Sequence, residues 1–128
     1  MSRSRSSARA AGARMERVVA DYLRDATGNE FIDRKVKTGS KDTGDVGGVR
    51  AHGQRVVVEV KDVAALSLPS ALREAEAEAI NDQALCGLVV AKRRGIGDPA
   101  QQLVAMTLGH FAALLTGDRR HWVGVGDE

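Results

Sequence analysis

The chain contains few cysteines and few aromatic residues, and each shortage excludes a class of protein. Cys86 is the only cysteine among 128 residues, so no intrachain disulfide can form, and a reducing compartment is expected. Its apolar neighbours make Cys86 a core residue rather than a nucleophile. Aromatic residues make up 3% of the chain, so base stacking is not expected to be the main mode of binding to single strands.

Long apolar runs are missing as well. No run approaches the roughly 20 residues of a membrane span, and the basic N-terminus lacks the apolar segment of a secretory signal. We therefore expect a soluble, cytoplasmic protein with no membrane partner. A phosphate-binding P-loop motif is absent, and His52, His110 and His121 match no zinc-ligand spacing, so turn or surface roles are expected for them.

The length and composition indicate one domain with two terminal extensions. With 43% hydrophobic residues, the chain can form a single core of Val, Leu, Ile and Ala. Residues 1–9 are predicted to be a basic, flexible arm, and 10–117 to be the folded domain. Residues 118–128 form a polar, glycine-rich tail, in which Trp122 packs either on the body or on a partner subunit.

Hydrophobic periodicity predicts an α/β fold with a central, mixed, five-stranded sheet flanked by helices. The strands 45–49 and 55–61, joined by a short turn, should be antiparallel, whereas 55–61 and 88–91, joined through a helix, should be parallel. The expected helices are 10–26, 69–83 and 108–115, and the expected strands are 31–37, 45–49, 55–61, 88–91 and 103–106.

Two of these helices have apolar positions that suggest which face is buried. In the second helix, a stripe of mostly small residues should pack on the sheet, and Glu74 and Glu78 are interpreted as a solvated face. The stripe consists of Ala71, Leu72, Ala75, Ala79 and Ile80. In the last helix, Leu108, Phe111, Ala112 and Leu115 are expected to point inward.

The most informative feature is a pair of acids on neighbouring strands. Glu59 interrupts a β-branched run that should be buried, and a carboxylate there is costly unless it is paired or holds a metal. Lys61 projects from the same face, about 7 Å along the strand. Asp45 begins the preceding strand, close enough to share one ion with Glu59.

These residues suit a magnesium site for phosphodiester hydrolysis. Mg²⁺ takes oxygen ligands at about 2.0–2.1 Å, which Asp45, Glu59 and the carbonyl of Val60 could supply. Lys61 would orient the attacking water and stabilise the charge that builds up on phosphorus. Glu16, one position off the apolar stripe of the first helix, could reach the edge of the site as a ligand or through water. A Glu-x-Lys motif alone is expected by chance in a chain with 28% charged residues. The evidence for a metal site is therefore the position of this motif in a Val-rich strand, after Gly-Asp-Val in the strand before it.

The order of these motifs resembles the PD-(D/E)-x-K nucleases, and among them the Holliday junction resolvases of archaea and phages. The matching segments are Glu16-Arg17, Lys37-Thr38-Gly39-Ser40-Lys41, Gly44-Asp45-Val46 and Glu59-Val60-Lys61. Gly44 stands where many members have proline, which affects turn rigidity and removes no ligand. Gln83 lies too late to match the helix glutamine of some members.

The resemblance implies a restriction-endonuclease-like core and a Mg²⁺-dependent endodeoxyribonuclease, in which Mn²⁺ would substitute. It further implies a homodimer with two active sites, each of which nicks one of two opposed strands at a four-way junction. The likeness to phage resolvases also suggests that the chain is phage-encoded. Basic residues would then contact the phosphates of branched or duplex DNA without reading bases, although solvated surface charge explains them as well. These residues are Arg5, Arg9, Arg14, Arg17, Arg34, Lys35, Lys37, Ser40, Lys41, Lys92, Arg93 and Arg94.

Two other functions stay open at this point. One is a nuclease of the same fold with a restriction or repair role, and the other is a catalytically silent DNA-binding subunit that uses only its basic residues.

Overall fold

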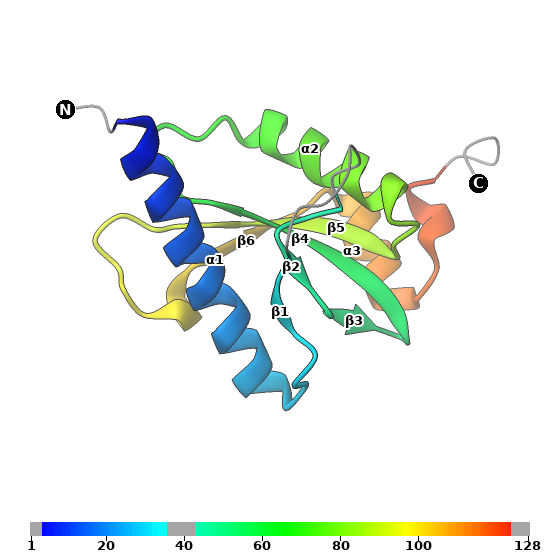
Figure 1. The fold of residues 1–128 in the computed structure, drawn as a ribbon. Coiled ribbons are helices and arrows are strands. Elements are labelled where there is room, and N and C mark those ends of the chain that lie inside the picture. The colour runs from blue at the N-terminus through cyan, green and yellow to red at the C-terminus, as the bar shows by residue number, and fades with distance from the viewer. Residues whose placement is uncertain (1–3, 36–42, 124–128) are drawn as a thin grey trace.

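The computed structural model describes residues 4–35 and 43–123, which form an α/β fold of helices around a mixed sheet (Figure 1). The sheet has six strands, five of them in the order β1-β2-β4-β5-β6, while β3 pairs with β4 outside this path. The predicted fold class is therefore confirmed, and β3 is the strand that the sequence did not predict. The strands are β1 (Asp33–Arg34), β2 (Val46–Gly47), β3 (Arg50–Ala51), β4 (Gln54–Lys61), β5 (Cys86–Ala91) and β6 (Leu103–Ala105).

The first helix begins earlier than its apolar pattern predicts. The helices are α1 (Arg5–Thr27), α2 (Leu68–Asn81) and α3 (Leu108–Thr116), with short 3₁₀ helices η1 (Pro99–Gln101) and η2 (Arg119–His121). The hydroxyl of Ser4 accepts a hydrogen bond from the N–H of Ser7 at 3.1 Å, which satisfies a free donor at the start of α1. Residues 5–9 are consequently helical rather than part of a flexible arm. At the other end, Gly28 closes α1 with a left-handed φ of 70°.

Strand β4 lies at the centre of the sheet. It pairs antiparallel with β2, where Val46 lies opposite Val58, and parallel with β5 along its length, as predicted. Side chains alternate between its two faces. Val58 belongs to the same core cluster as Met15 of α1, whereas Val57 packs with Ala79 of α2. Glu59 and Lys61 lie two and four residues after Val57, so their side chains project from the same face of β4, toward α2.

Helix α2 packs very closely on the sheet because its buried positions are mostly alanine. Ala75 and Ala79 are fully buried, and opposite them β5 carries Gly87, which has no side chain to keep the helix away. A Cβ atom at Gly87 would lie 2.5 Å from the carbonyl oxygen of Ala75. Ile80, expected on the packed face, is 50% exposed.

Helix α3 presents a different face to the core than predicted. Leu108 is 80% exposed, while His110 and Ala113 are buried. The imidazole Nδ1 of His110 accepts a hydrogen bond from the N–H of Gly87 at 2.9 Å, and its ring stacks on Trp122 with the centroids 4.1 Å apart. These contacts turn the apolar positions Leu108, Phe111 and Leu115 outward, so their predicted burial is wrong, as is a surface role for His110.

Trp122 and Cys86 both belong to the packed body of the protein. The indole Nε1 donates a hydrogen bond to the carbonyl of Leu85 at 2.6 Å, so Trp122 packs on the body of its own chain. Cys86 is a buried core residue, as expected, and burial raises the pKa of its thiol to about 11. None of the described helices is both long and apolar enough to cross a bilayer.

The close packing of α2 gives a first prediction. Gly87→Ala should destabilise the protein by about 1–3 kcal/mol, because the added methyl group pushes α2 away from β5. Gly12→Ala is the matched control. A Cβ at Gly12 meets nothing within 4 Å in α1, so this change should stabilise by about 0.5–1 kcal/mol. Urea denaturation of both variants measures the effects, and equal midpoints would contradict this account of the packing.

Candidate functional site

Asp45 is held against β4 by its backbone and its side chain. Its N–H donates to the carbonyl of Val58 at 2.9 Å, and its Oδ2 accepts a hydrogen bond from the N–H of Val60 at 2.8 Å. The residue is 2% exposed. The predicted neighbourhood of Asp45, Glu59 and Val60 is therefore present. A ligand role for the Val60 carbonyl stays a prediction.

Gly44 allows the chain to deliver Asp45 to this position. Its φ is 104°, a conformation that L-residues rarely adopt and that proline cannot. A Cβ there would also lie 3.1 Å from Cγ1 of Val57. A glycine at position 44 is thus required by the local backbone of this chain.

Glu59 lies in the buried part of β4 among other carboxyl groups. The residue is 5% exposed, and its Oε2 has no hydrogen-bond partner among the described residues. Burial, followed by the neighbouring carboxyls of Glu78 and Asp45, raises the pKa of Glu59 to about 11. Without a cation, this carboxyl therefore keeps its proton at neutral pH.

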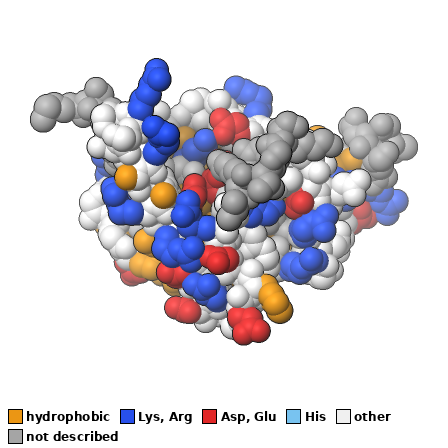
Figure 2. Space-filling model, viewed as in Figure 1, with side chains coloured by type: hydrophobic (Ala, Val, Ile, Leu, Met, Phe, Trp, Pro, Cys, Tyr) orange, Lys and Arg blue, Asp and Glu red, His pale blue; other side chains and the backbone are white. Residues whose placement is uncertain are grey.

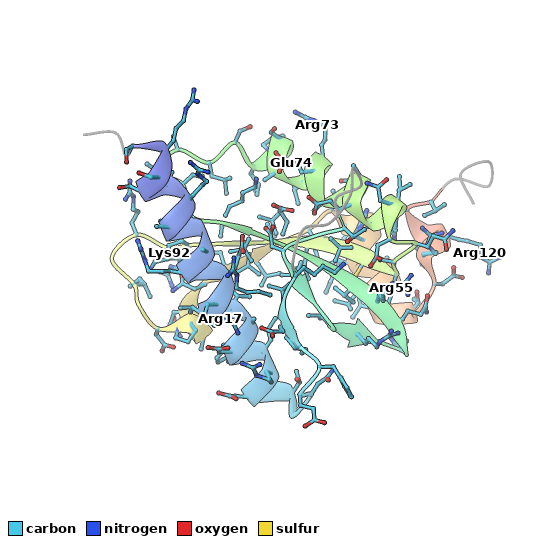
Figure 3. All side chains as sticks on the ribbon, in the orientation of Figure 1. Arg17, Arg55, Arg73, Glu74, Lys92 and Arg120 are labelled. Carbon is cyan, nitrogen blue, oxygen red and sulfur yellow. The ribbon has the colours of Figure 1, made fainter. Side chains whose placement is uncertain are left out.

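Helix α2 carries two acids, Glu74 and Glu78, that were both predicted to face solvent. Glu78 is 4% exposed, so that interpretation is wrong for Glu78, whereas Glu74 is exposed (Figure 3). Oxygen atoms of Glu59, Glu74 and Glu78 all lie within 4.8 Å of one another, a spacing that can hold a metal ion. The missed signal was helical spacing, because Glu78 follows Ala71 and Ala75 at positions i+7 and i+3 on the buried stripe.

Lys61 ends β4 between two of these acids. Its Nζ lies 2.7 Å from Oε2 of Glu74 and 3.7 Å from Oε1 of Glu59. Partial burial by itself lowers the pKa of Lys61, but the hydrogen bond to Glu74 and the nearby carboxylates outweigh it and leave the pKa above its ordinary value. Lys61 is consequently an ammonium group, which can donate hydrogen bonds but cannot accept a proton.

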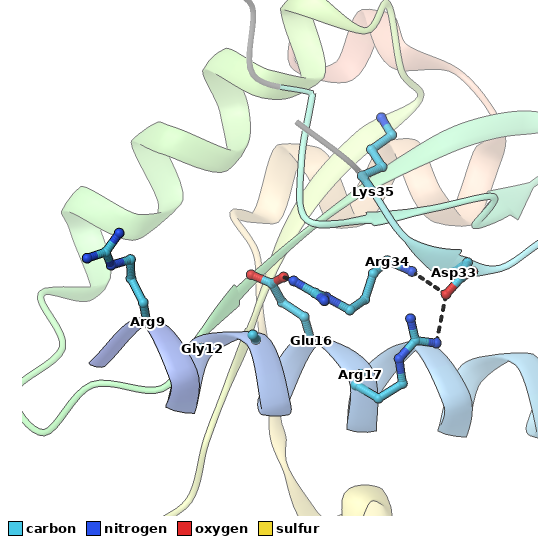
Figure 4. Close-up of a pocket in the computed structure, with 8 residues that line it drawn as sticks. Arg9, Gly12, Glu16, Arg17, Asp33, Arg34 and Lys35 are labelled. Carbon is cyan, nitrogen blue, oxygen red and sulfur yellow. Dashed lines mark hydrogen bonds and ion pairs between the residues drawn. The ribbon is translucent and has the colours of Figure 1, made fainter. Parts of the chain in front are cut away.

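Glu16 is not among the contacts of this cluster. It lies on α1, which packs on the other face of β4, and its Oε1 forms an ion pair with Nη2 of Arg34 at 3.0 Å. It lines a groove of about 680 Å³ between α1 and the β1 segment, together with Arg9, Arg17, Asp33, Arg34 and Lys35 (Figure 4). Its predicted support of the metal site stays a prediction.

The predicted phosphate contacts fall into two groups according to their partners. Several have protein partners: Arg17 pairs with Asp21 and Asp33, Arg34 with Glu16, and the Nζ groups of Lys35 and Lys92 donate to the carbonyls of Thr43 and Ile96. Arg93 donates from its guanidinium to the carbonyl of Gln101. Lys37, Ser40 and Lys41 lie outside the described residues.

The second group carries exposed charge with no acidic partner in the described chain. It consists of Arg5, Arg9, Arg14 and Arg94, three of which follow one another along α1. Figure 2 shows Lys and Arg side chains spread over the face that α1 forms, with acids among them.

The site thus combines four acids and one ammonium group. Two of the acids come from neighbouring strands and two from α2, and Glu59 touches both groups. No family model, curated protein or solved structure matches this chain. The chemistry of the site must therefore be argued from its own residues.

The raised pKa of Glu59 gives a second prediction. The folded protein holds this proton up to about pH 11, whereas the unfolded chain releases it near the ordinary value of 4.5, so metal-free stability should fall as the pH rises from about 5 to 9. Glu59→Gln should flatten this dependence, because the amide has no proton to release. Thermal melts in EDTA at several pH values measure it. The exposed Glu30→Gln is the control and should leave the slope unchanged, and an equal slope in both variants would contradict the assignment.

Proposed function

We propose that this protein is a metal-dependent endodeoxyribonuclease that nicks branched DNA, with four-way junctions as its substrate. The observation that carries the proposal is the buried carboxyl of Glu59, placed against Asp45 and Glu78 and beside an ammonium group. Carboxylates this close repel one another, and a divalent cation removes that repulsion where a proton would otherwise be needed. Carboxylate oxygen donors fit Mg²⁺, with Mn²⁺ as a substitute.

Within the proposal, Asp45 and Glu59 hold the cation, and Glu78 adds a third carboxylate from α2. The hydrogen bond from the N–H of Val60 orients Asp45, so that its two oxygens are not equivalent. When bound, the cation supplies Lewis-acid polarisation of a phosphoryl oxygen and a water of lowered pKa. The protein contributes a fixed, largely buried set of oxygens, which needs little rearrangement when the cation binds.

Lys61 acts as a charge stabiliser rather than a general base. Because its pKa is raised, the ammonium persists at neutral pH and donates a hydrogen bond to a phosphate oxygen as negative charge develops there. Glu74 and Glu59 hold the ammonium from two sides until DNA enters. The position of Lys61 in β4 ties this charge to the same strand that carries Glu59.

The basic residues bind the DNA backbone in this proposal. Arg5, Arg9 and Arg14 project from α1, and Arg9 lines the groove beside β1. Phosphate contacts of this kind position DNA without reading sequence, which suits a substrate recognised by its shape. Paired nicking of two strands requires two active sites, so the proposal includes a homodimer.

Cleavage assays test the catalytic part. With Mg²⁺, the protein should make paired, symmetric nicks in labelled four-way junctions. Asp45→Asn, Glu59→Gln and Lys61→Ala should each lower the cleavage rate at least about 10³-fold, because each removes a charge from the reacting centre, while junction affinity stays within a few-fold of the parent.

The controls of this assay separate the alternatives. Glu30→Gln, an exposed acid on the loop after α1, should cleave like the parent. General cutting of linear duplex would instead favour a restriction or repair nuclease, and binding without cleavage would favour a DNA-binding subunit. Full activity in any two of the three site variants would contradict the site assignment.

The salt dependence of binding tests the phosphate contacts. Arg9→Ala should reduce the slope of log K against log salt by about 0.9, the value for one lost contact with duplex DNA. Arg17→Ala, on the same helix, should change the slope much less, because its charge is already paired with Asp21 and Asp33. Fluorescence anisotropy across a salt series measures both. Equal slopes for parent and Arg9→Ala would remove Arg9 from the interface.

A further inference from the structure

The C-terminal part of the fold exposes several large apolar side chains in a stretch of the chain without charge. From Pro99 to Gly117 the chain contains no Lys, Arg, Asp or Glu, although 28% of all residues are of these types. Five large apolar side chains of β6 and α3 are between 44% and 80% exposed, and we call them the β6–α3 surface: Leu103, Val104, Leu108, Phe111 and Leu115. Three of them, Val104, Leu108 and Phe111, line one groove. Scattered apolar residues need no explanation, but a shared apolar groove marks an interaction site.

A groove runs along this surface to α2. It has a volume of about 450 Å³ and is lined by Leu68 and Leu72 of α2, Val104 and Met106, and Leu108 and Phe111 of α3. Every side chain named here is apolar, and none can be ionised. The surface therefore has both projecting apolar side chains and a groove of matching chemistry that could receive them.

The β6–α3 surface includes an open edge of the sheet. Strand β6 is last in the strand order and pairs antiparallel with β5 on one side; no described residue pairs with its other side. Exposed edges are usually protected by a lysine, a proline or a bulge. The three-residue strand Leu103-Val104-Ala105 contains no lysine and no proline, so this short stretch of edge can pair with another strand.

We propose that a second copy of this chain covers the β6–α3 surface and forms a two-fold symmetric dimer. In such a dimer a patch meets its own copy, so the patch must be complementary to itself. An uncharged patch satisfies that condition, whereas a nucleic acid would require basic residues. The edge strand meets it as well, because two copies of β6 related by a two-fold axis run antiparallel.

This inference names the partner surface that the proposed function requires, but it stands on the apolar residues alone. The basic side of α1 and the acid cluster do not take part in it. Its test uses neither DNA nor metal, so the dimer can fail while the nuclease stands, and the reverse also holds.

Sedimentation velocity of the full chain over a dilution series tests the proposal. The parent protein should sediment with twice the 13.6 kDa mass of one chain. Leu108→Glu should raise the dimer dissociation constant about 100-fold or more, because each copy would bury an unpaired carboxylate against the other. Val104→Lys should do the same by protecting the edge of β6.

The position of Leu108 and a matched control separate a loss of the interface from an effect on folding or on the surface in general. Leu108 is the first residue of α3, where the helix dipole favours a carboxylate and no acid is present, so Leu108→Glu should fold normally. Phe31→Glu is the matched control, because Phe31 is also 80% exposed but lies after α1, outside the surface. It should leave the dimer intact.

Three results would overturn the proposal. A parent protein that stays monomeric at about 100 μM would show that this surface does not bind a second copy tightly enough to matter. A dimer of Leu108→Glu as tight as the parent would place the interface elsewhere. Equal weakening by Phe31→Glu would show that the effect is not specific to the β6–α3 surface.

Discussion

The contact between α2 and the sheet is the constraint on which the site depends. Three alanines on the helix and Gly87 on β5 leave so little side-chain volume between the two layers that the backbones nearly touch. Because the two layers are so close, the carboxyl of Glu78 lies beside that of Glu59, and the carboxyl of Glu74 contacts the ammonium of Lys61. Larger residues on either layer would separate the helix acids from the strand acids. The same small residues that build this part of the core therefore also set the geometry of the charged cluster, and its stability and its chemistry share one origin.

The negative charge of the acid cluster exceeds the positive charge of the one ammonium beside it. Glu59 lies beside the carboxyls of Asp45, Glu74 and Glu78, and the one nearby ammonium is shared with Glu74. Burial of such a group is unfavourable for folding in the absence of a counter-ion, and structures keep groups of this kind mainly where they act on a ligand. Helix α1, which packs on the other face of β4, carries exposed cationic charge at Arg5, Arg9 and Arg14.

Much of the fold could be predicted from the sequence, because strand and helix periodicities are local signals. The Val-rich run around Glu59 gave a central strand, and the loop and helix between 61 and 88 gave its parallel neighbour. Asp45 beside Glu59 was predictable for the same reason. The burial of Glu78 was not taken from the sequence, since acids on a helix usually face water, and only the spacing from Ala71 and Ala75 indicated otherwise. The orientation of α3 also depended on a distant contact, the hydrogen bond between His110 and Gly87, which no local pattern contains. The early start of α1 rested on one serine cap.

The shared position of Glu59 has a consequence for how this protein can vary over generations. Because the Glu59 carboxyl lies beside three acids and one ammonium, the effect of replacing any of them depends on which others are present. Loss of Lys61 alone would remove the ammonium beside Glu59 and Glu74, and loss of the Glu78 side chain alone would leave a void on the buried face of α2. Related chains should therefore exchange these side chains in groups, so that the identities at positions 45, 59, 61 and 78 covary rather than drift one at a time.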